Sequence, residues 1–224
     1  LMTLSQAASV IMGANIGTTA TSWLLSLSAV EGEGWVSLFK PTTFTPVLAV
    51  AGIIMLMFLK SDKKKTLGVI LLGFATLMFG MNAMSEAVTP LENNEAFGQF
   101  MTAFSNPILG VVTGAALTAL IQSSSVSVGI LQTFAKTSGI TYSIALPIIL
   151  GTNIGSCVTA LISSIGANKS AKRVAIVHLY FNIIGTIIFL SLFYILNSFL
   201  DFAFMNSALN SFGIAGIHTV FNVL

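Results

Sequence analysis

Long apolar stretches separated by short polar segments run along the whole chain. Each stretch approaches the length of about 20 residues that a helix needs to cross a bilayer. The predicted helices lie at residues 4–30, 44–60, 66–89, 141–167 and 174–198. Residues 31–43 and 90–106 are polar connections, and residues 199–211 are typical of an interfacial segment before a final helix that begins at residue 212. The pattern predicts an all-α protein that crosses a membrane several times.

Residues 107–137 show a different pattern, in which two short apolar pieces flank a polar tip. The first piece, Pro107 to Ile121, contains about 15 residues or roughly 22 Å of helix, which is short for a full crossing. The run Gln122-Ser123-Ser124-Ser125 interrupts it, and a second short piece, Val126 to Phe134, follows. This pattern predicts a re-entrant hairpin, which enters and leaves the membrane by the same face.

Basic residues gather in two short segments, residues 60–65 and 168–173. Short loops rich in Lys and Arg tend to face the cytoplasm, so we expect both segments on that side. Two predicted crossings, residues 66–89 and 141–167, separate the two basic segments. Two crossings return the chain to the same side, which requires that residues 107–137 do not cross. Charge and helix length therefore both favour the hairpin.

A short motif occurs twice in the chain. Residues 12–18 (MGANIGT) match residues 150–156 (LGTNIGS), and the Gly-x-Asn-Ile-Gly core of each predicts a break within its helix. With residues 168–173 in the cytoplasm, residues 141–167 cross the membrane towards the cytoplasm. Counting the crossings back along the chain, residues 4–30 cross away from it. The two copies of the motif are therefore inverted relative to each other. Inverted repeats with broken helices that meet near the midplane recur in secondary transporters. Because a hairpin precedes the second copy, the repeat predicts a similar hairpin before Leu1.

Composition narrows the class of protein. Of the 224 residues, 55% are hydrophobic and 7% are charged. A soluble domain carries about 25% charged residues, so an ordinary soluble enzyme is excluded. The net charge of +2 gives no reason to expect nucleic acid, and the single cysteine excludes an internal disulfide. The predicted fold class is an all-α polytopic membrane protein with inverted repeats, a re-entrant hairpin and broken transmembrane helices.

The polar tip and the two motifs carry the candidate chemistry. Non-helical backbone at membrane depth has to be buried in protein or line a wet cavity. A helix that begins at the serines presents free N–H groups and hydroxyls at its N-terminus, which favour an anion. Neutral oxygens suit a hard cation such as Na⁺. The predicted spans carry no central Asp, Glu, Lys or Arg, which favours cation-coupled anion transport over a proton relay.

The two histidines of the chain each begin a His-x-x-Phe-Asn motif, His178 to Asn182 (HLYFN) and His218 to Asn222 (HTVFN). Because they lack an acidic partner, they are a poor transition-metal site, and we interpret them as structural residues that tie the broken helices to their neighbours. Cys157 is interpreted as a packing residue. Ser124 with His178 would be the pair of an intramembrane serine hydrolase, although the chain has no G-x-S-x-G elbow. Hydroxyls that only join helices are a further alternative.

The segments IMGANIGTTATS, TALIQSSSVSVGI and IILGTNIGSCVTAL, together with the two histidine motifs, resemble the type II sodium–phosphate cotransporter family, including its bacterial members. The resemblance spans almost the whole chain. It implies two inverted repeats, each with a QSS hairpin and a broken helix, that bind phosphate and Na⁺ between them. This chain contains one QSS run, and Ser156 and Cys157 stand where threonines are common in the family.

The resemblance also implies roles for individual residues. Those similar to phosphate-contacting positions are Ser123, Ser124, Ser125, Thr18 and Thr21. Those that resemble sodium ligands are Gln122, Ser123, Ser156 and Thr159. Those that shape the two breaks are Asn15, Asn153, Gly17, Gly155 and Thr152. No catalytic residue, cofactor or transition-metal site is expected, and Na⁺ is the only metal.

We therefore expect Na⁺-coupled symport of inorganic phosphate by alternating access, not an enzyme, in a multi-pass protein of the bacterial inner membrane. Its partners are phosphate, Na⁺ and lipid, and a homodimer is left open. The alternatives are a Na⁺-coupled symporter of another anion, a dicarboxylate or sulfate, and the serine hydrolase. The chain divides into residues 1–30 (remnant of the first repeat), 31–106 (connecting and scaffold helices), 107–198 (second repeat) and 199–224 (interfacial segment and start of a final helix).

Overall fold

The computed structural model describes residues 3–27, 41–88, 90 and 104–224. The expected polar connections at residues 31–43 and 90–106 lie largely outside these residues. The helices are α1 (Leu4–Ser26), α2 (Pro41–Phe58), α3 (Asp62–Val88), α5 (Pro107–Ile121), α6 (Ser124–Ser138), α7 (Tyr142–Ser163), α8 (Lys169–Leu200) and α9 (Ser211–Val223). A short 3₁₀ helix, η4 (Ala203–Asn206), lies between α8 and α9.

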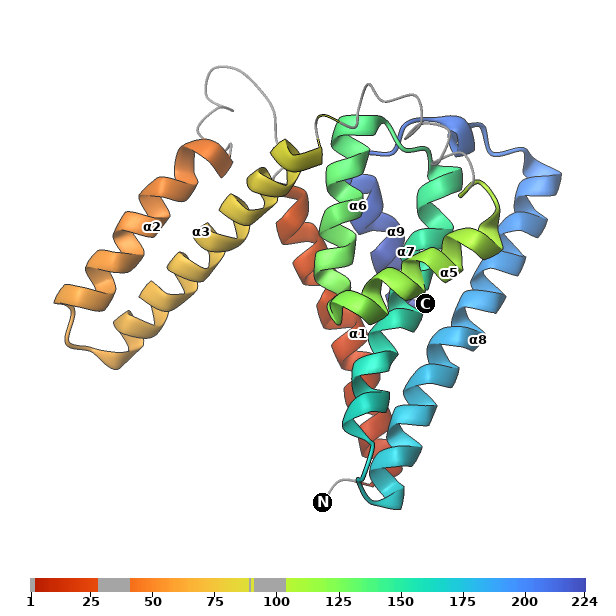
Figure 1. The fold of residues 1–224 in the computed structure, drawn as a ribbon, viewed down its shortest axis with the longest axis horizontal. Coiled ribbons are helices and arrows are strands. Elements are labelled where there is room, and N and C mark those ends of the chain that lie inside the picture. The colour runs from red at the N-terminus through yellow and green to blue at the C-terminus, as the bar shows by residue number, and fades with distance from the viewer. Residues whose placement is uncertain (1–2, 28–40, 89, 91–103) are drawn as a thin grey trace.

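The helices α1, α7, α8 and α9 form a bundle against which α5 and α6 pack, and α2 and α3 form a separate hairpin that meets the bundle where α3 contacts α6 (Figure 1). In Figure 1, α1 and α8 rise from the lower end, whereas α7 and α9 descend from the upper end. The opposite directions of α1 and α7 are those that an inverted repeat requires.

Within the described ranges, three helical segments are long and apolar enough to cross a membrane: residues 62–84 of α3, the whole of α7 and the whole of α8. Residues 43–58 of α2, together with α5 and α9, are shorter apolar helices. Together they confirm the predicted class, an all-α polytopic membrane protein.

The two basic segments begin helices rather than forming loops. Asp62 to Lys65 lie in the first turn of α3, and Lys169 to Arg173 begin α8, which Asn168 caps by accepting a hydrogen bond from the Ala171 N–H at 2.9 Å. In Figure 1 both helices start at their lower ends and run upwards, and the placement of these starts on one side of a membrane stays a prediction.

The predicted breaks in α1 and α7 are wrong, because both helices continue through residues 13–17 and 151–155. No helix begins at Thr18 or Ser156, because both residues lie inside these continuous helices. Gly and Asn lower helix propensity by about 1 kcal/mol or less, whereas a backbone group left unpaired in a bilayer costs several kcal/mol. The unbroken helix is therefore the favourable solution.

The glycines of the second motif serve helix packing instead. Gly151 and Gly155 of α7 face α5, where an added Cβ atom would overlap the carbonyl oxygens of Val111 and Ala115. Gly114 of α5 is equally close to the backbone of α7. Small residues that recur every four positions let two membrane helices approach closely. The motif thus fixes the hairpin against α7.

Candidate ion-binding site

The polar tip joins α5 to α6, as predicted. α5 ends at Gln122, which has left-handed backbone angles (φ 60°, ψ 25°) and donates its N–H to the Thr118 carbonyl at 2.7 Å. Ser123 is the N-cap of α6, and its hydroxyl accepts a hydrogen bond from the Val126 N–H at 3.3 Å. The turn lies near the mid-height of α7 and α8 (Figure 1). The helix–turn–helix is confirmed, and its re-entry into a membrane stays a prediction.

The N-terminus of α6 supplies the donors that an anion needs. Ser124 and Ser125 form its first turn, where backbone N–H groups have no carbonyl partner within the helix. The partial positive charge of the helix end lies at the same place. Both residues are half-buried, so the first turn of α6 is partly accessible at the tip.

Gln122 is an unusual residue at its position. Left-handed angles cost a residue with a side chain about 1–2 kcal/mol, and glycine adopts them freely. Among the described residues, Asp201 is the other non-glycine with positive φ. The exposed amide of Gln122 is therefore retained at a position where glycine would stabilise the turn, which points to a role for the side chain.

The hydroxyls of the two motifs are oriented by their own helices. Ser156 donates to the Asn153 carbonyl at 2.7 Å, and Thr159 donates to the Ser156 carbonyl at 2.9 Å. Thr18 donates to the Ala14 carbonyl at 2.9 Å. Because each proton is directed at a carbonyl, the oxygen lone pairs point elsewhere and are available to a cation.

Packing of α5 on α7 brings part of the predicted site together. An added Cβ atom on Gly155 would also meet the Thr118 side chain, at 2.7 Å. The two helices run in parallel register here, so Gln122 and Thr159 each lie one turn beyond this contact. The packing therefore brings the α5–α6 tip towards the part of α7 that carries the predicted sodium ligands Ser156 and Thr159.

The residues of the first motif are less closely associated with the tip. Ser125 lines an apolar cleft of about 200 Å³ with Leu25 of α1 and Met81 of α3. Thr21 lies one turn before Leu25 and is half-buried, as is Thr18. Among the described residues, no hydrogen bond joins Thr18 or Thr21 to the tip. Gly17 has no atom within 4 Å of an added Cβ, unlike Gly155.

The two asparagine motifs are connected through α8. Asn15 is buried, and its Oδ1 lies 3.4 Å from Nε2 of His178. The His178 carbonyl is 3.5 Å from Sγ of the buried Cys157, next to Ser156. Asn153 and Thr152 are buried and bond to the Ile149 carbonyl. His178 therefore joins helices, as interpreted, although these helices are unbroken.

Gln132 of α6 is a junction that sequence reasoning missed. Its side chain is buried, and its Nε2 lies 3.0 Å from the Ser22 carbonyl of α1 and 3.3 Å from the Ser211 carbonyl of α9. The sequence feature that could have indicated this role is an amide side chain placed between the apolar residues Leu131 and Phe134 of a predicted membrane helix. This residue ties the hairpin to the two helices that flank the first motif.

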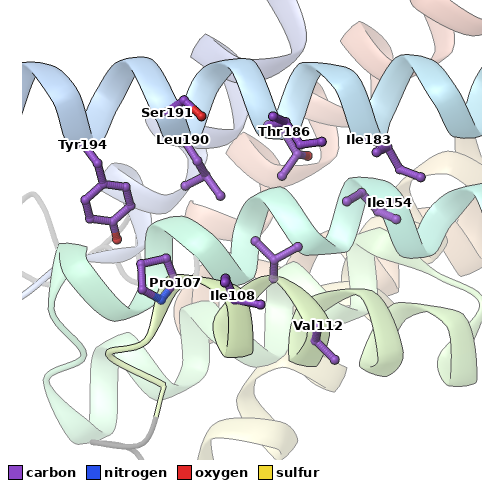
Figure 2. Close-up of a pocket in the computed structure, with 11 residues that line it drawn as sticks. Pro107, Ile108, Val112, Ile154, Ile183, Thr186, Leu190, Ser191 and Tyr194 are labelled. Carbon is purple, nitrogen blue, oxygen red and sulfur yellow. The ribbon is translucent and has the colours of Figure 1, made fainter.

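A cleft beside the hairpin is apolar and differs from the predicted ion site. It has a volume of about 400 Å³ and lies between α5, α7 and α8. Figure 2 shows Pro107 and Ile108 on one side and Leu190 and Tyr194 of α8 on the other. None of the predicted ion ligands lines it.

The fold is that of a polytopic helical membrane protein. The profile of the family described as Na⁺/Pi-cotransporter matches residues 1–86 and 76–213. The chain belongs to this family, which confirms the resemblance.

Several relatives are similar over much of the chain. An uncharacterized protein, YqeW of Bacillus subtilis, is 28% identical over 180 residues, covering 78% of this chain and 53% of its own. The putative inorganic phosphate export protein YjbB of Escherichia coli is 26% identical over 197 residues, covering 88% and 34%. The human sodium-dependent phosphate transport protein 2B is 33% identical over 131 residues, covering 54% and 19%. The chain thus spans about half or less of these relatives' length, and no solved structure matches it.

Proposed function

We propose that the chain belongs to a symporter that moves inorganic phosphate with Na⁺ across the bacterial inner membrane by alternating access, and that it is not an enzyme. The observation that carries this proposal is the hairpin tip. There, Gln122 leads directly into the serine-rich N-terminus of α6, and α5 packs closely on the part of α7 that carries Ser156 and Thr159. Membership of the Na⁺/Pi-cotransporter family supports the same substrates.

In this proposal the two ions share one neutral site. Phosphate oxygens accept from the first-turn N–H groups of α6 and from the hydroxyls of Ser123, Ser124 and Ser125, with Thr18 and Thr21 contributing from α1. Na⁺ binds oxygens of Gln122, Ser123, Ser156 and Thr159. Removing either ion from water alone is expensive, and the cation offsets the charge of the anion. Binding both ions therefore favours the rearrangement that either ion alone does not.

The decisive experiment is transport by the full-length protein in liposomes. We expect uptake of radiolabelled phosphate to follow an inward Na⁺ gradient and to fall to background when K⁺ replaces Na⁺. Sulfate and succinate are the competitors that test the other-anion alternative. Competition by either anion more strongly than by unlabelled phosphate would overturn the proposed substrate.

A second candidate is phosphate export, which the name of YjbB favours. The same liposomes loaded with phosphate test it. Efflux without Na⁺ on either side supports an uncoupled exporter, whereas efflux that requires internal Na⁺ supports the symporter running in reverse.

The hydrolase alternative has lost its geometric support, since no hydrogen bond joins Ser124 to His178 in the described part of the chain. Labelling by a fluorophosphonate tests it directly. Modification of Ser124 in a protein without phosphate transport would restore this alternative.

The proposed topology places the α2–α3 and α7–α8 connections in the cytoplasm. Ser61 and Ser170 are exposed there and accept cysteine substitutions, in a Cys157→Ser background. In right-side-out vesicles, an impermeant maleimide should label neither position until the membrane is opened. Labelling of one position alone in intact vesicles would contradict the shared side.

A further inference from the structure

His178 and His218 lie on two helices with equivalent surroundings. α7 packs along α8 and α1 packs along α9, while α8 also touches α1 and α9 also touches α7. α1 and α7 run in opposite directions, as do α8 and α9 (Figure 1). Exchanging α1 with α7 and α8 with α9 leaves this set of contacts unchanged. A pseudo-two-fold axis in the membrane plane generates such an arrangement.

The two histidine motifs are also built alike. In α8, Nδ2 of Asn182 donates to the His178 carbonyl at 3.0 Å. In α9, Nδ2 of Asn222 donates to the His218 carbonyl at 2.8 Å. In each motif the asparagine is held by its own helix, and the imidazole is left to contact another helix.

The two imidazoles differ in what they contact. His178 reaches Asn15, the asparagine of the first motif, at 3.4 Å. His218 is completely buried, and neither of its ring nitrogens has a hydrogen-bond partner among the described residues. A buried polar group without a partner costs about 1–3 kcal/mol, so this arrangement leaves an interaction unmade. The counterpart of Asn15 is Asn153 of α7, the asparagine of the second motif.

We infer that His218 is a positioning residue that bonds Asn153 in the opposite-facing state, in exchange for the bond between His178 and Asn15. The inference rests on the alternating access of the proposed function. Contacts within each helix pair are retained in both states. These include Trp23 Nε1 to Thr219 Oγ1 at 2.9 Å between α1 and α9, and Asn182 Nδ2 to Cys157 Sγ at 3.3 Å between α7 and α8.

The exchange of one histidine–asparagine bond for the other keeps the free energies of the two states similar. A ligand shifts a conformational equilibrium only by its difference in affinity for the two states. Replacing one histidine–asparagine bond by an equivalent one keeps the two states close in free energy. Ion binding can then decide between them.

Cross-linking of cysteine pairs tests the exchange in the full-length protein, in a Cys157→Ser background. The first pair is Asn15→Cys with His178→Cys, and the second is Asn153→Cys with His218→Cys. Trp23→Cys with Thr219→Cys is the control, because this contact lies within one helix pair. A short bis-thiosulfonate joins each pair, with Na⁺ and phosphate supplied on either side of the liposome.

We expect any condition that lowers the yield of the first cross-link about two-fold to raise the second by the same fraction of the protein, with the control unchanged. If the two cross-links rise and fall together, or the second never forms, the inference is overturned. Because cysteine replaces the asparagines in this test, a second measurement retains them.

Spin labels at Ser5 and Ser170, both exposed at the lower end, report the state when only a histidine is changed. His178→Ala should shift the distance distribution towards the opposite-facing state, and His218→Ala should shift it the other way. His178→Gln, which can still donate to Asn15, should restore the original distribution. Shifts in one common direction, or none, would indicate residues that only stabilise the fold. Reciprocal shifts without phosphate transport would leave this inference standing and remove the proposed substrate.

Discussion

Gly155 of α7 lies directly against Ala115 of α5, so closely that a Cβ atom on the glycine would overlap the alanine carbonyl oxygen. Gly151 meets Val111 in the same way, one turn earlier. These contacts set the position of the hairpin on α7. They therefore also set where Gln122 lies relative to Thr159.

Replacement of Gly155 by alanine should disrupt this packing. Overpacking costs about 1–3 kcal/mol, and here the neighbour is backbone that cannot rotate away. We expect Gly155→Ala to lower the thermal midpoint and to abolish phosphate uptake. Gly73→Ala is the matched control, because nothing lies within 4 Å of its added Cβ. Wild-type uptake by Gly155→Ala would show that this contact does not position the hairpin.

Gln122→Gly should separate stability from transport. Glycine relieves the left-handed strain at φ 60°, so the variant should be more stable by up to about 1–2 kcal/mol. It also removes the proposed sodium ligand, so Na⁺-dependent uptake should be lost. Gln122→Asn, which keeps an amide and tolerates left-handed angles, is the control and should retain partial uptake. Full uptake by the glycine variant would remove Gln122 from the site.

The repeat makes a prediction about Gly17, the counterpart of Gly155. If a second hairpin packs on α1 as α5 packs on α7, Gly17→Ala in the full-length protein should reduce stability and uptake as severely as Gly155→Ala. In this structure the position is open. Thermal midpoints of the two variants, measured beside Gly73→Ala, decide the matter. A Gly17→Ala variant with the thermal midpoint and uptake of the wild type would contradict the predicted second hairpin.

Gln132→Leu should weaken the junction of α6 with α1 and α9. Hydrogen bonds between membrane helices contribute about 0.6 kcal/mol on average, so the loss of two should cost roughly 1 kcal/mol. Ser22→Ala is the control, because the shorter bond from Gln132 is to the Ser22 carbonyl, which this variant keeps. Denaturation in mild detergent measures both. Equal losses would show that the Ser22 hydroxyl matters instead.

The amino-acid sequence by itself determined the class of protein and the hairpin, because both follow from local signals. Too few charges for a soluble surface required a membrane protein. The bounds of α5 were predictable because Asn106 and Pro107 form a standard helix start and four consecutive polar residues end the apolar run. The serine cap of α6 followed from the same local chemistry.

Only the tertiary structure decided how the repeated motif is used. A glycine and asparagine cluster is compatible with a broken helix or with a continuous helix in close contact, and the choice depends on whether a partner such as α5 approaches. The contacts of Asn15 with His178 and of Gln132 with Ser22 depend likewise on helix crossings between segments far apart in the chain. Helical periodicity gives the face on which a residue lies, but the partner across that face is set by how the helices pack.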